Sequence, residues 1–253
     1  EIALIEMTQA PARTSYYFYN SDATDGMEGR YMTFDPTGMQ VVATYSDGTT
    51  DVIDNSKLTF SHIPAAPGTH KVTVSSANGK TFETEVKVAV SKSTKATPST
   101  TIVGAEDNST GFWGAHAEDI NVPAGETREI NFTNYSTLGA NWNNFVPILR
   151  KADLTEYAVV RADNYGWGAG YDGNPDLLTS GGQADWGTWL AAMNGAKCTV
   201  WVTNCNNGTA DVQCIMHGTD GIDYVQYYLG IRYVDPNDLF VSFTVDGCHL
   251  VFE

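Results

Sequence analysis

The sequence predicts an all-β protein built from two β-sandwiches, and three observations lead to this class. Short runs of alternating apolar and polar residues recur along the chain, separated by Asn-Gly and Asp-Gly turns, as in antiparallel strands. No stretch carries a sustained helical period. A small, polar segment at 91–101 (SKSTKATPSTT) has the composition of a linker. We therefore expect one domain over 1–90, a linker over 91–101 and a second domain over 102–253.

Composition and charge narrow the functions open to such a protein. The chain has 14 Lys and Arg residues and 30 Asp and Glu residues, so its formal net charge is −16. This acidity disfavours nucleic acid, anionic membranes and polyanionic substrates as partners, because their recognition needs basic surface. No run of about 18 apolar residues is present, so we expect no membrane insertion. The first residues lack the pattern of a signal peptide, which predicts either that a signal was removed or that the chain was cut from something larger.

Charge and aromatic residues divide unevenly between the two halves. Residues 1–90 carry a net charge of −5 and residues 102–253 a net charge of −13. All six tryptophans and all four cysteines lie in the second half. We therefore assign ligand binding to the second half and a spacer role to the first.

The first half has the strand and turn pattern of a small sandwich. Alternating runs over 39–45, 70–74 and 82–90 predict strands, and 46–49 (SDGT) and 77–80 (ANGK) predict the turns of hairpins.

Three motifs in this half resemble a bacterial immunoglobulin-like domain: residues 34–39 (FDPTGM), 41–49 (VVATYSDGT) and 67–72 (PGTHKV). The resemblance covers about residues 3–90. It implies a module that spaces or presents its neighbours on secreted, multidomain surface proteins. Tyr16, Tyr17 and Tyr19 either contact a partner or, as we favour, pack within the protein.

The strand pattern of the second half predicts a larger sandwich of jelly-roll type. Its seven predicted strands cover 127–135, 144–150, 156–162, 197–202, 211–216, 224–231 and 239–245. Residues 185–193 (DWGTWLAAM) predict one short helix, with Trp189 facing the core and Trp186 left undecided.

The four cysteines lack the CxxC spacing of a zinc site. A turn at 206–208 would place Cys198 and Cys214 on one face of a hairpin, either as a disulfide or, as we favour, as two buried thiols. Trp201 alternates away from its apolar neighbours, so it lies either on an open sheet face or under a loop.

One glycine-rich segment, 156–174 (EYAVVRADNYGWGAGYDGN), carries the most information on function. Aromatic side chains on such a loop are costly to expose unless a ligand covers them. Flat rings bind the apolar face of a sugar, and planar polar groups bind its hydroxyls with paired hydrogen bonds. The rings are Tyr165, Trp167 and Tyr171, and the polar groups are Arg161, Asp163 and Asn164. The alternative is an Arg161–Asp163 pair that braces the loop while its rings fold inward.

Two further segments are expected at the same rim of the sandwich. Residues 141–144 (NWNN) offer Trp142 between amides, Asn141 among them, and residues 111–116 (GFWGAH) offer Trp113 and His116. For His116 alone, a structural role is the simpler interpretation.

Together, residues 111–116, 132–136 (FTNYS), 141–145 (NWNNF), 156–168 and 234–243 (VDPNDLFVSF) resemble the jelly-roll carbohydrate-binding domains of polysaccharide-utilising proteins from gut bacteria. The resemblance covers about residues 105–253. It implies non-catalytic, extracellular or cell-surface binding of a neutral polysaccharide, and a glucan such as starch or a β-glucan is the expected partner.

The sequence leaves two other functions open, a glycosidase and an adhesin. A glycosidase needs two carboxylates at a defined separation, and the available acids lack the E-x-D-x-x-E pattern of sandwich glycosidases. An adhesin that binds a protein would also use Trp and Tyr. We expect no cofactor; a structural calcium ion at Asp172, Asp176, Asp235 or Asp238 is the one exception left open.

Overall fold

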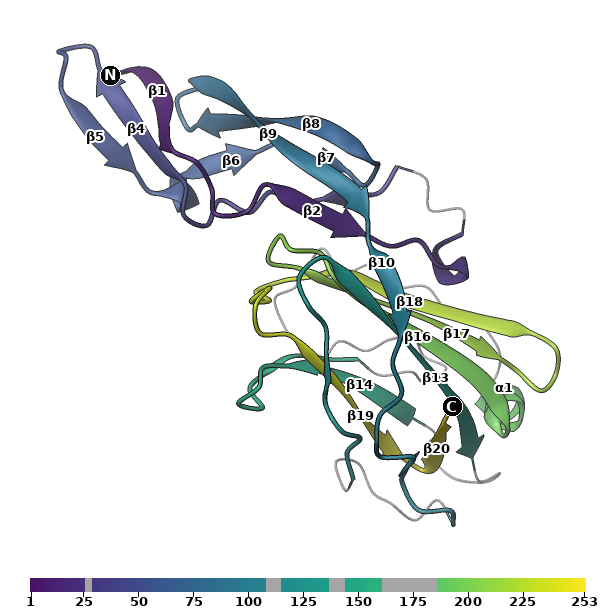
Figure 1. Ribbon diagram of the computed structural model, residues 1–253. Coiled ribbons are helices and arrows are strands. Elements are labelled where there is room, and N and C mark those ends of the chain that lie inside the picture. The colour runs from purple at the N-terminus through teal and green to yellow at the C-terminus, as the bar shows by residue number, and fades with distance from the viewer. Residues whose placement is uncertain (26–28, 108–114, 137–143, 161–185) are drawn as a thin grey trace. The chain divides into compact units, whose positions relative to one another are not determined.

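The computed structural model describes residues 1–25, 29–107, 115–136, 144–160 and 186–253 (Figure 1). Strands dominate this part of the chain, and its one α-helix is α1 (Trp186–Met193). The all-β class is therefore confirmed. The chain divides into two compact units: Glu1–Phe18 with Met27–Val90, and Tyr19–Gly26 with Ser91–Glu253.

The first unit contains two main sheets and a short strand pair. One sheet has the order β1-β4-β5, and the other has the order β2-β9-β8-β6, in which β2 runs parallel to β9. Their bounds are β1 (Ile2–Gln9), β2 (Ser15–Phe18), β4 (Gln40–Tyr45), β5 (Thr50–Ile53), β6 (Leu58–Phe60), β8 (Gly68–Ser76) and β9 (Thr81–Val90). The pair consists of β3 (Tyr31–Met32) and β7 (Ile63–Pro64). The immunoglobulin-like assignment of this unit stays a prediction.

The turns of this unit form as the sequence indicates. Asp47 accepts hydrogen bonds from the backbone N–H and the hydroxyl of Thr49, at 3.0 and 2.6 Å. Gly48 takes a positive φ that few other residues tolerate. Tyr16, one of the tyrosines considered for partner contact, is fully buried, and its hydroxyl accepts a hydrogen bond from the backbone N–H of Asp35 at 2.9 Å. Burial raises its pKa.

The second unit is a two-sheet sandwich (Figure 1). The larger sheet has the order β11-β20-β13-β16-β17-β18, and β10 also pairs with β13. Its strands are β10 (Lys92–Lys95), β11 (Ile102–Val103), β13 (Glu126–Ser136), β16 (Ala196–Asn204), β17 (Ala210–His217), β18 (Asp223–Ile231) and β20 (Cys248–Phe252). The smaller sheet has the order β12-β19-β14-β15, with β12 (Ile120–Asn121), β14 (Asn144–Arg150), β15 (Glu156–Val159) and β19 (Phe240–Asp246).

The inner faces of these sheets form one continuous hydrophobic core. Phe132 lies near its centre and makes edge-on contacts with Phe145, Phe243 and Phe252, whose ring centroids lie 4.9 to 5.7 Å away. Trp189 on α1 is fully buried in the same core, as its spacing predicted.

The seven strands predicted for the second unit all form. Six have ends that shift by at most two residues, and the predicted end of the seventh, at Ala162, lies outside the described residues. The structure adds β10, β11, β12 and β20, which the sequence did not indicate. Residues 91–101 were expected to be a linker, yet β10 occupies four of them and pairs in parallel with Glu126–Glu129 of β13. Its Ser, Thr and Lys side chains have linker composition, but its backbone groups complete the edge of a sheet.

The second unit also includes Tyr19–Gly26, which the sequence placed in the first domain. This segment contains the short 3₁₀ turn η1 (Asp22–Thr24), with Ser21 as its N-cap. Gln213 of β17 accepts hydrogen bonds from the backbone N–H and the hydroxyl of Ser21, and its amide donates to the carbonyl oxygen of Tyr19 at 2.7 Å.

All four cysteines are buried thiols, so the thiol interpretation of Cys198 and Cys214 is confirmed. In the register of β16 and β17, Cys198 lies opposite Met216 and Cys214 lies opposite Val200, which makes the two cysteines a diagonal pair. Burial raises the pKa of the Cys198, Cys214 and Cys248 thiols. These thiols are therefore protonated core groups.

No helix in the described ranges has both the length and the apolar composition needed to cross a bilayer.

Candidate functional site

The predicted sugar-binding residues fall almost entirely outside the described part of the chain. Nine of the ten lie there: Trp113, Asn141, Trp142, Arg161, Asp163, Asn164, Tyr165, Trp167 and Tyr171. His116 is the one predicted site residue that the structure describes. What the structure does give is the position of the described residues that flank these segments.

Those flanking residues come together around the hairpin formed by β19 and β20. Ser136, the last residue of β13, lies opposite Cys248 of β20. Asn144, the first residue of β14, lies opposite Asp246 at the end of β19. The two residues that flank 137–143 therefore both lie at the β19–β20 hairpin.

The other two segments are anchored close by. The hydroxyl of Thr244 on β19 donates a hydrogen bond to the carbonyl oxygen of Ala115 at 2.6 Å. The backbone N–H of Val160 donates to the carbonyl oxygen of Pro147 on β14 at 2.9 Å. Ser136 donates to the carbonyl oxygen of Leu190 at 2.9 Å, which holds α1 at the end of β13. We call this region, marked by Ala115, Ser136, Asn144, Val160 and α1, the loop end.

His116 is exposed and lies in a charged environment. Its pKa is lowered, first by partial burial and then by the Arg150 cation, while the Asp119 and Glu156 carboxylates act in the opposite direction. Arg150 in turn donates from Nε to Asp119 at 2.8 Å. Neutral imidazole at this position can donate and accept hydrogen bonds, which suits hydroxyl groups.

Several carboxylates that a glycosidase could have used are occupied separately in the structure. Glu118 accepts from the backbone N–H of Ser99 at 2.8 Å, and Asp119 is bound by Arg150. Glu126 pairs with Arg128 at 2.5 Å. Each of these acids therefore has a structural partner of its own.

The acidic residues considered as calcium ligands also accept hydrogen bonds from the protein, where the structure describes them. Asp235 accepts from the backbone N–H of Asn237, and Asp238 accepts from that of Ala152. Asp172 and Asp176 lie outside the described residues. Within the described residues, no group of three or more His, Cys, Asp and Glu side chains lies close enough together to hold a metal ion.

A second polar region lies on the outer face of the larger sheet, where the sequence singled out only Trp201. Trp201 is half-buried, and its Nε1 donates to Oε2 of Glu129, the cross-strand neighbour on β13, at 3.3 Å. Its side chain therefore lies on the outer face of the sheet and is half covered, next to the fully buried Gln213 of β17.

Hydrogen bonds continue from Glu129 along this face. Asn131 donates from Nδ2 to Oε1 of Glu129 at 3.1 Å, and its Oδ1 accepts from the hydroxyl of Thr199 at 2.7 Å. Lys197 and the hydroxyl of Thr133 both donate to Oε1 of Glu253. These side chains are ordered by one another before any ligand arrives.

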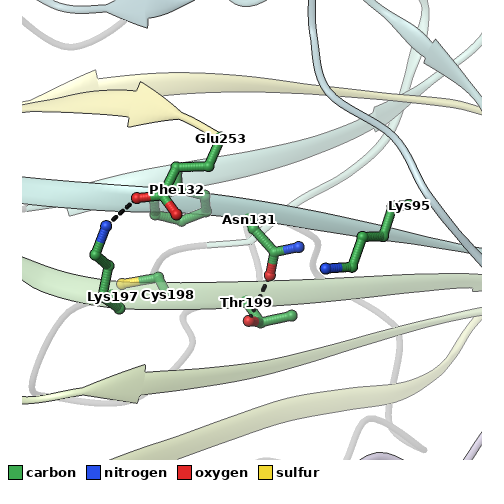
Figure 2. A pocket seen from close by; sticks show the side chains of 7 residues that line it. All are labelled: Lys95, Asn131, Phe132, Lys197, Cys198, Thr199 and Glu253. Carbon is green, nitrogen blue, oxygen red and sulfur yellow. Dashed lines mark hydrogen bonds and ion pairs between the residues drawn. The ribbon is translucent and has the colours of Figure 1, made fainter.

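A hollow of about 530 Å³ lies over this part of the sheet. Figure 2 shows the side chains of the seven residues that line it: Lys95, Asn131, Phe132, Lys197, Cys198, Thr199 and Glu253. Sequence reasoning missed this hollow, because its residues come from β10, β13, β16 and the end of the chain. The alternation of polar residues in β13 and β16 was the available signal.

Comparisons with known proteins add little to this geometry. No known family profile and no curated protein matches the chain. Among solved structures, the lectin UEA-II complexed with galactose aligns at 11% identity and a TM-score of 0.33, over 78% of this chain and 91% of that one. A structure of carbohydrate-binding modules from the β-sandwich superfamily aligns at 14% identity and a TM-score of 0.21, over 100% of this chain and 98% of that one. At these TM-scores neither likeness carries an argument.

Proposed function

We propose that this protein binds a neutral polysaccharide without catalysis, through the aromatic segments that join the sandwich at its loop end. A glucan, either starch or a β-glucan, is the proposed ligand. One observation carries the proposal: the described residues that flank 137–143 and 108–114 meet at the β19–β20 hairpin, and those that flank the third aromatic segment bond to the adjoining strands β14 and β13. Segments anchored this close to one another can contribute rings and amides to one ligand.

The chemistry of these segments supports a sugar over a charged ligand. Indole and phenol rings bind the C–H face of a pyranose, and amide, Arg and Asp groups bind its hydroxyls. A net charge of −16 repels polyanions. The separate partners of Glu118, Asp119 and Glu126 favour binding over hydrolysis.

The proposal includes the setting of the protein. We place it outside the cell or on the cell surface, as one part of a larger multidomain protein of the kind that gut bacteria use on polysaccharides. The first unit would then act as a spacer of immunoglobulin-like type. Single sites of this kind bind with about −4 to −8 kcal/mol, and repeated epitopes on a polymer raise the overall avidity.

Affinity electrophoresis on starch, mixed-linkage β-glucan, xyloglucan, xylan and mannan tests the proposal. We expect one neutral polymer to retard the parent chain and Trp142→Ala or Trp167→Ala to abolish the retardation. Tyr233→Ala is the matched control, because Tyr233 is an aromatic residue that is 82% exposed. Retardation should change little between low and high salt, since no ion pair to the ligand is needed.

Three results would overturn the proposal. Migration that none of the polymers alters would remove the polysaccharide ligand. Release of reducing sugar on long incubation would make the protein an enzyme. Retention only by a cell extract, lost after the extract is treated with protease, would make it an adhesin.

A further inference from the structure

We propose that the hollow on the outer face of the larger sheet is a second saccharide site, separate from the loop end, which takes a neutral, hydroxyl-rich ring. This inference rests on the proposed binding of polysaccharide, and it adds a site that the aromatic segments do not include. Three features of the sheet support this site: the register of β13 and β16, the charge balance of the hollow and the hydrogen-bonding groups around it.

The register brings the polar groups into adjacent rows. Asn131 lies opposite Thr199, and Thr133 lies opposite Lys197. The Phe132–Cys198 pair lies between these rows, with both side chains in the core on the other face of the sheet. Neighbouring strands are about 4.8 Å apart and alternate residues share a face, so these polar groups are spaced on the scale of one sugar ring.

The charges in and beside the hollow balance. Lys197 pairs with Glu253, and Lys95 lies 3.8 Å from Glu129. The hollow and its immediate surroundings therefore hold two cations and two anions, although the net charge of the whole chain is −16. A site with no net charge gives no electrostatic advantage to a charged ligand, so it favours a neutral one.

The groups around the hollow also keep hydrogen-bonding capacity. The Lys95–Glu129 separation of 3.8 Å is too long for a hydrogen bond, so the Lys95 ammonium can donate to a ligand hydroxyl. The amide of Asn131 has a second N–H, and Thr199 can accept through its oxygen while donating to Asn131. Donors and acceptors thus alternate over a short distance, as vicinal hydroxyls require.

A peptide strand is a poorer occupant for a physical reason. The floor lies inside the sheet, where the backbone groups of β13 and β16 bond to each other and β13 also pairs with β10 and β20. Strand addition needs unpaired backbone groups at a sheet edge. Recognition over this floor must therefore come from side chains.

The test uses the full chain with maltoheptaose and cellohexaose as probes, by calorimetry and by amide NMR shifts. We expect Asn131→Ala, Thr199→Val and Lys95→Ala each to weaken one class of sites about 3- to 10-fold, the effect of one lost hydrogen bond. Lys92→Ala is the matched control, because Lys92 lies on the same strand but outside the hollow. Unchanged thermal unfolding of each variant shows that the sheet remains intact.

The double variant Trp142→Ala/Trp167→Ala separates the two proposals. If it keeps one class of sites, and adding Thr199→Val weakens that class about 3- to 10-fold, both proposals stand. If it loses all binding while Asn131→Ala and Thr199→Val bind like the parent, the second site is overturned and the proposed function stands. If it binds like the parent and the sheet variants weaken all of the binding, the loop end is overturned instead. A parent that binds neither probe overturns the second site, and binding only to a protease-sensitive extract does the same.

Discussion

The hydroxyl of Ser21 donates a hydrogen bond to Oε1 of Gln213 at 2.5 Å, although the two residues are 192 positions apart in the chain. The same oxygen accepts from the backbone N–H of Ser21 at 3.1 Å. On its other side, the Gln213 amide donates to the carbonyl oxygen of Tyr19. One fully buried side chain on β17 therefore satisfies three polar groups of a segment that comes from early in the sequence.

Replacing Gln213 tests how much this contact contributes. Gln213→Ala leaves the N–H and hydroxyl of Ser21 and the carbonyl of Tyr19 without their partner, so we expect a loss of about 1–3 kcal/mol in unfolding free energy. Gln9→Ala, at an exposed glutamine that donates to Gly38, should change it by less than about 0.5 kcal/mol. Urea unfolding measures both, and equal effects would contradict the assigned role.

The buried thiols make a chemical prediction. Burial raises the pKa of Cys198, Cys214 and Cys248, so the thiolate fraction at pH 8 is small and access is blocked. We expect Ellman's reagent to label none of the four cysteines in the native protein and all four in denaturant. A native mass that is lower by the two hydrogens of a disulfide would refute this.

Gly104 and Gly48 form a matched pair of glycines with positive φ. At Gly104 an added Cβ would lie 2.7 Å from the carbonyl oxygen of Cys248 and 2.8 Å from Val245, whereas at Gly48 nothing lies within 4 Å. Gly48→Ala therefore carries only backbone strain, about 1 kcal/mol, while Gly104→Ala adds a steric clash of about 1–3 kcal/mol. The midpoint of thermal unfolding should be clearly lower for Gly104→Ala than for Gly48→Ala. Equal midpoints would show that the β19–β20 hairpin can move aside.

His249 stacks on Tyr135 with ring centroids 5.0 Å apart, and partial burial lowers its pKa while Glu106 acts in the opposite direction. A histidine whose folded-state pKa is depressed binds fewer protons than in the unfolded chain. Its contribution to stability is therefore present above the unfolded pKa of about 6.5 and is lost as the pH falls through the folded pKa.

We expect stability to fall between pH 7.5 and 5.5, and His249→Gln to reduce that fall. Most carboxylates titrate below this window, which keeps their contribution small. Urea unfolding at the two pH values, with an NMR titration of the imidazole protons, provides the measurement. A His249 pKa above 6.5 would reverse the expected sign.

Local pattern was enough for the strands whose side chains alternate cleanly. Residues 197–202 alternate between Cys198, Val200 and Val202 on one face and polar residues or Trp201 on the other, and β16 forms there. The short helix with Trp189 was equally readable, because its apolar residues share one face. β10 and β20 were missed because one has linker composition and the other is a five-residue strand directly after Gly247.

The two candidate sites also differ in how well the sequence predicts them. The rings and amides of the loop end stand out in the sequence because each segment is dense in aromatic residues. The hollow could not be read in this way, since Asn131, Thr199 and Lys95 are ordinary strand residues until the register of three strands places them together.

By itself, the sequence determined the all-β class, most of the strands and turns, the acidic surface and the aromatic segments, because these depend on composition and on a period of two residues. The tertiary structure decided that Tyr19–Gly26 belongs to the second unit, that Trp201 lies half-buried beside Glu129, and which polar side chains share a hollow. The reason is that strand pairing joins residues far apart in the chain, and no local pattern specifies which strands become neighbours.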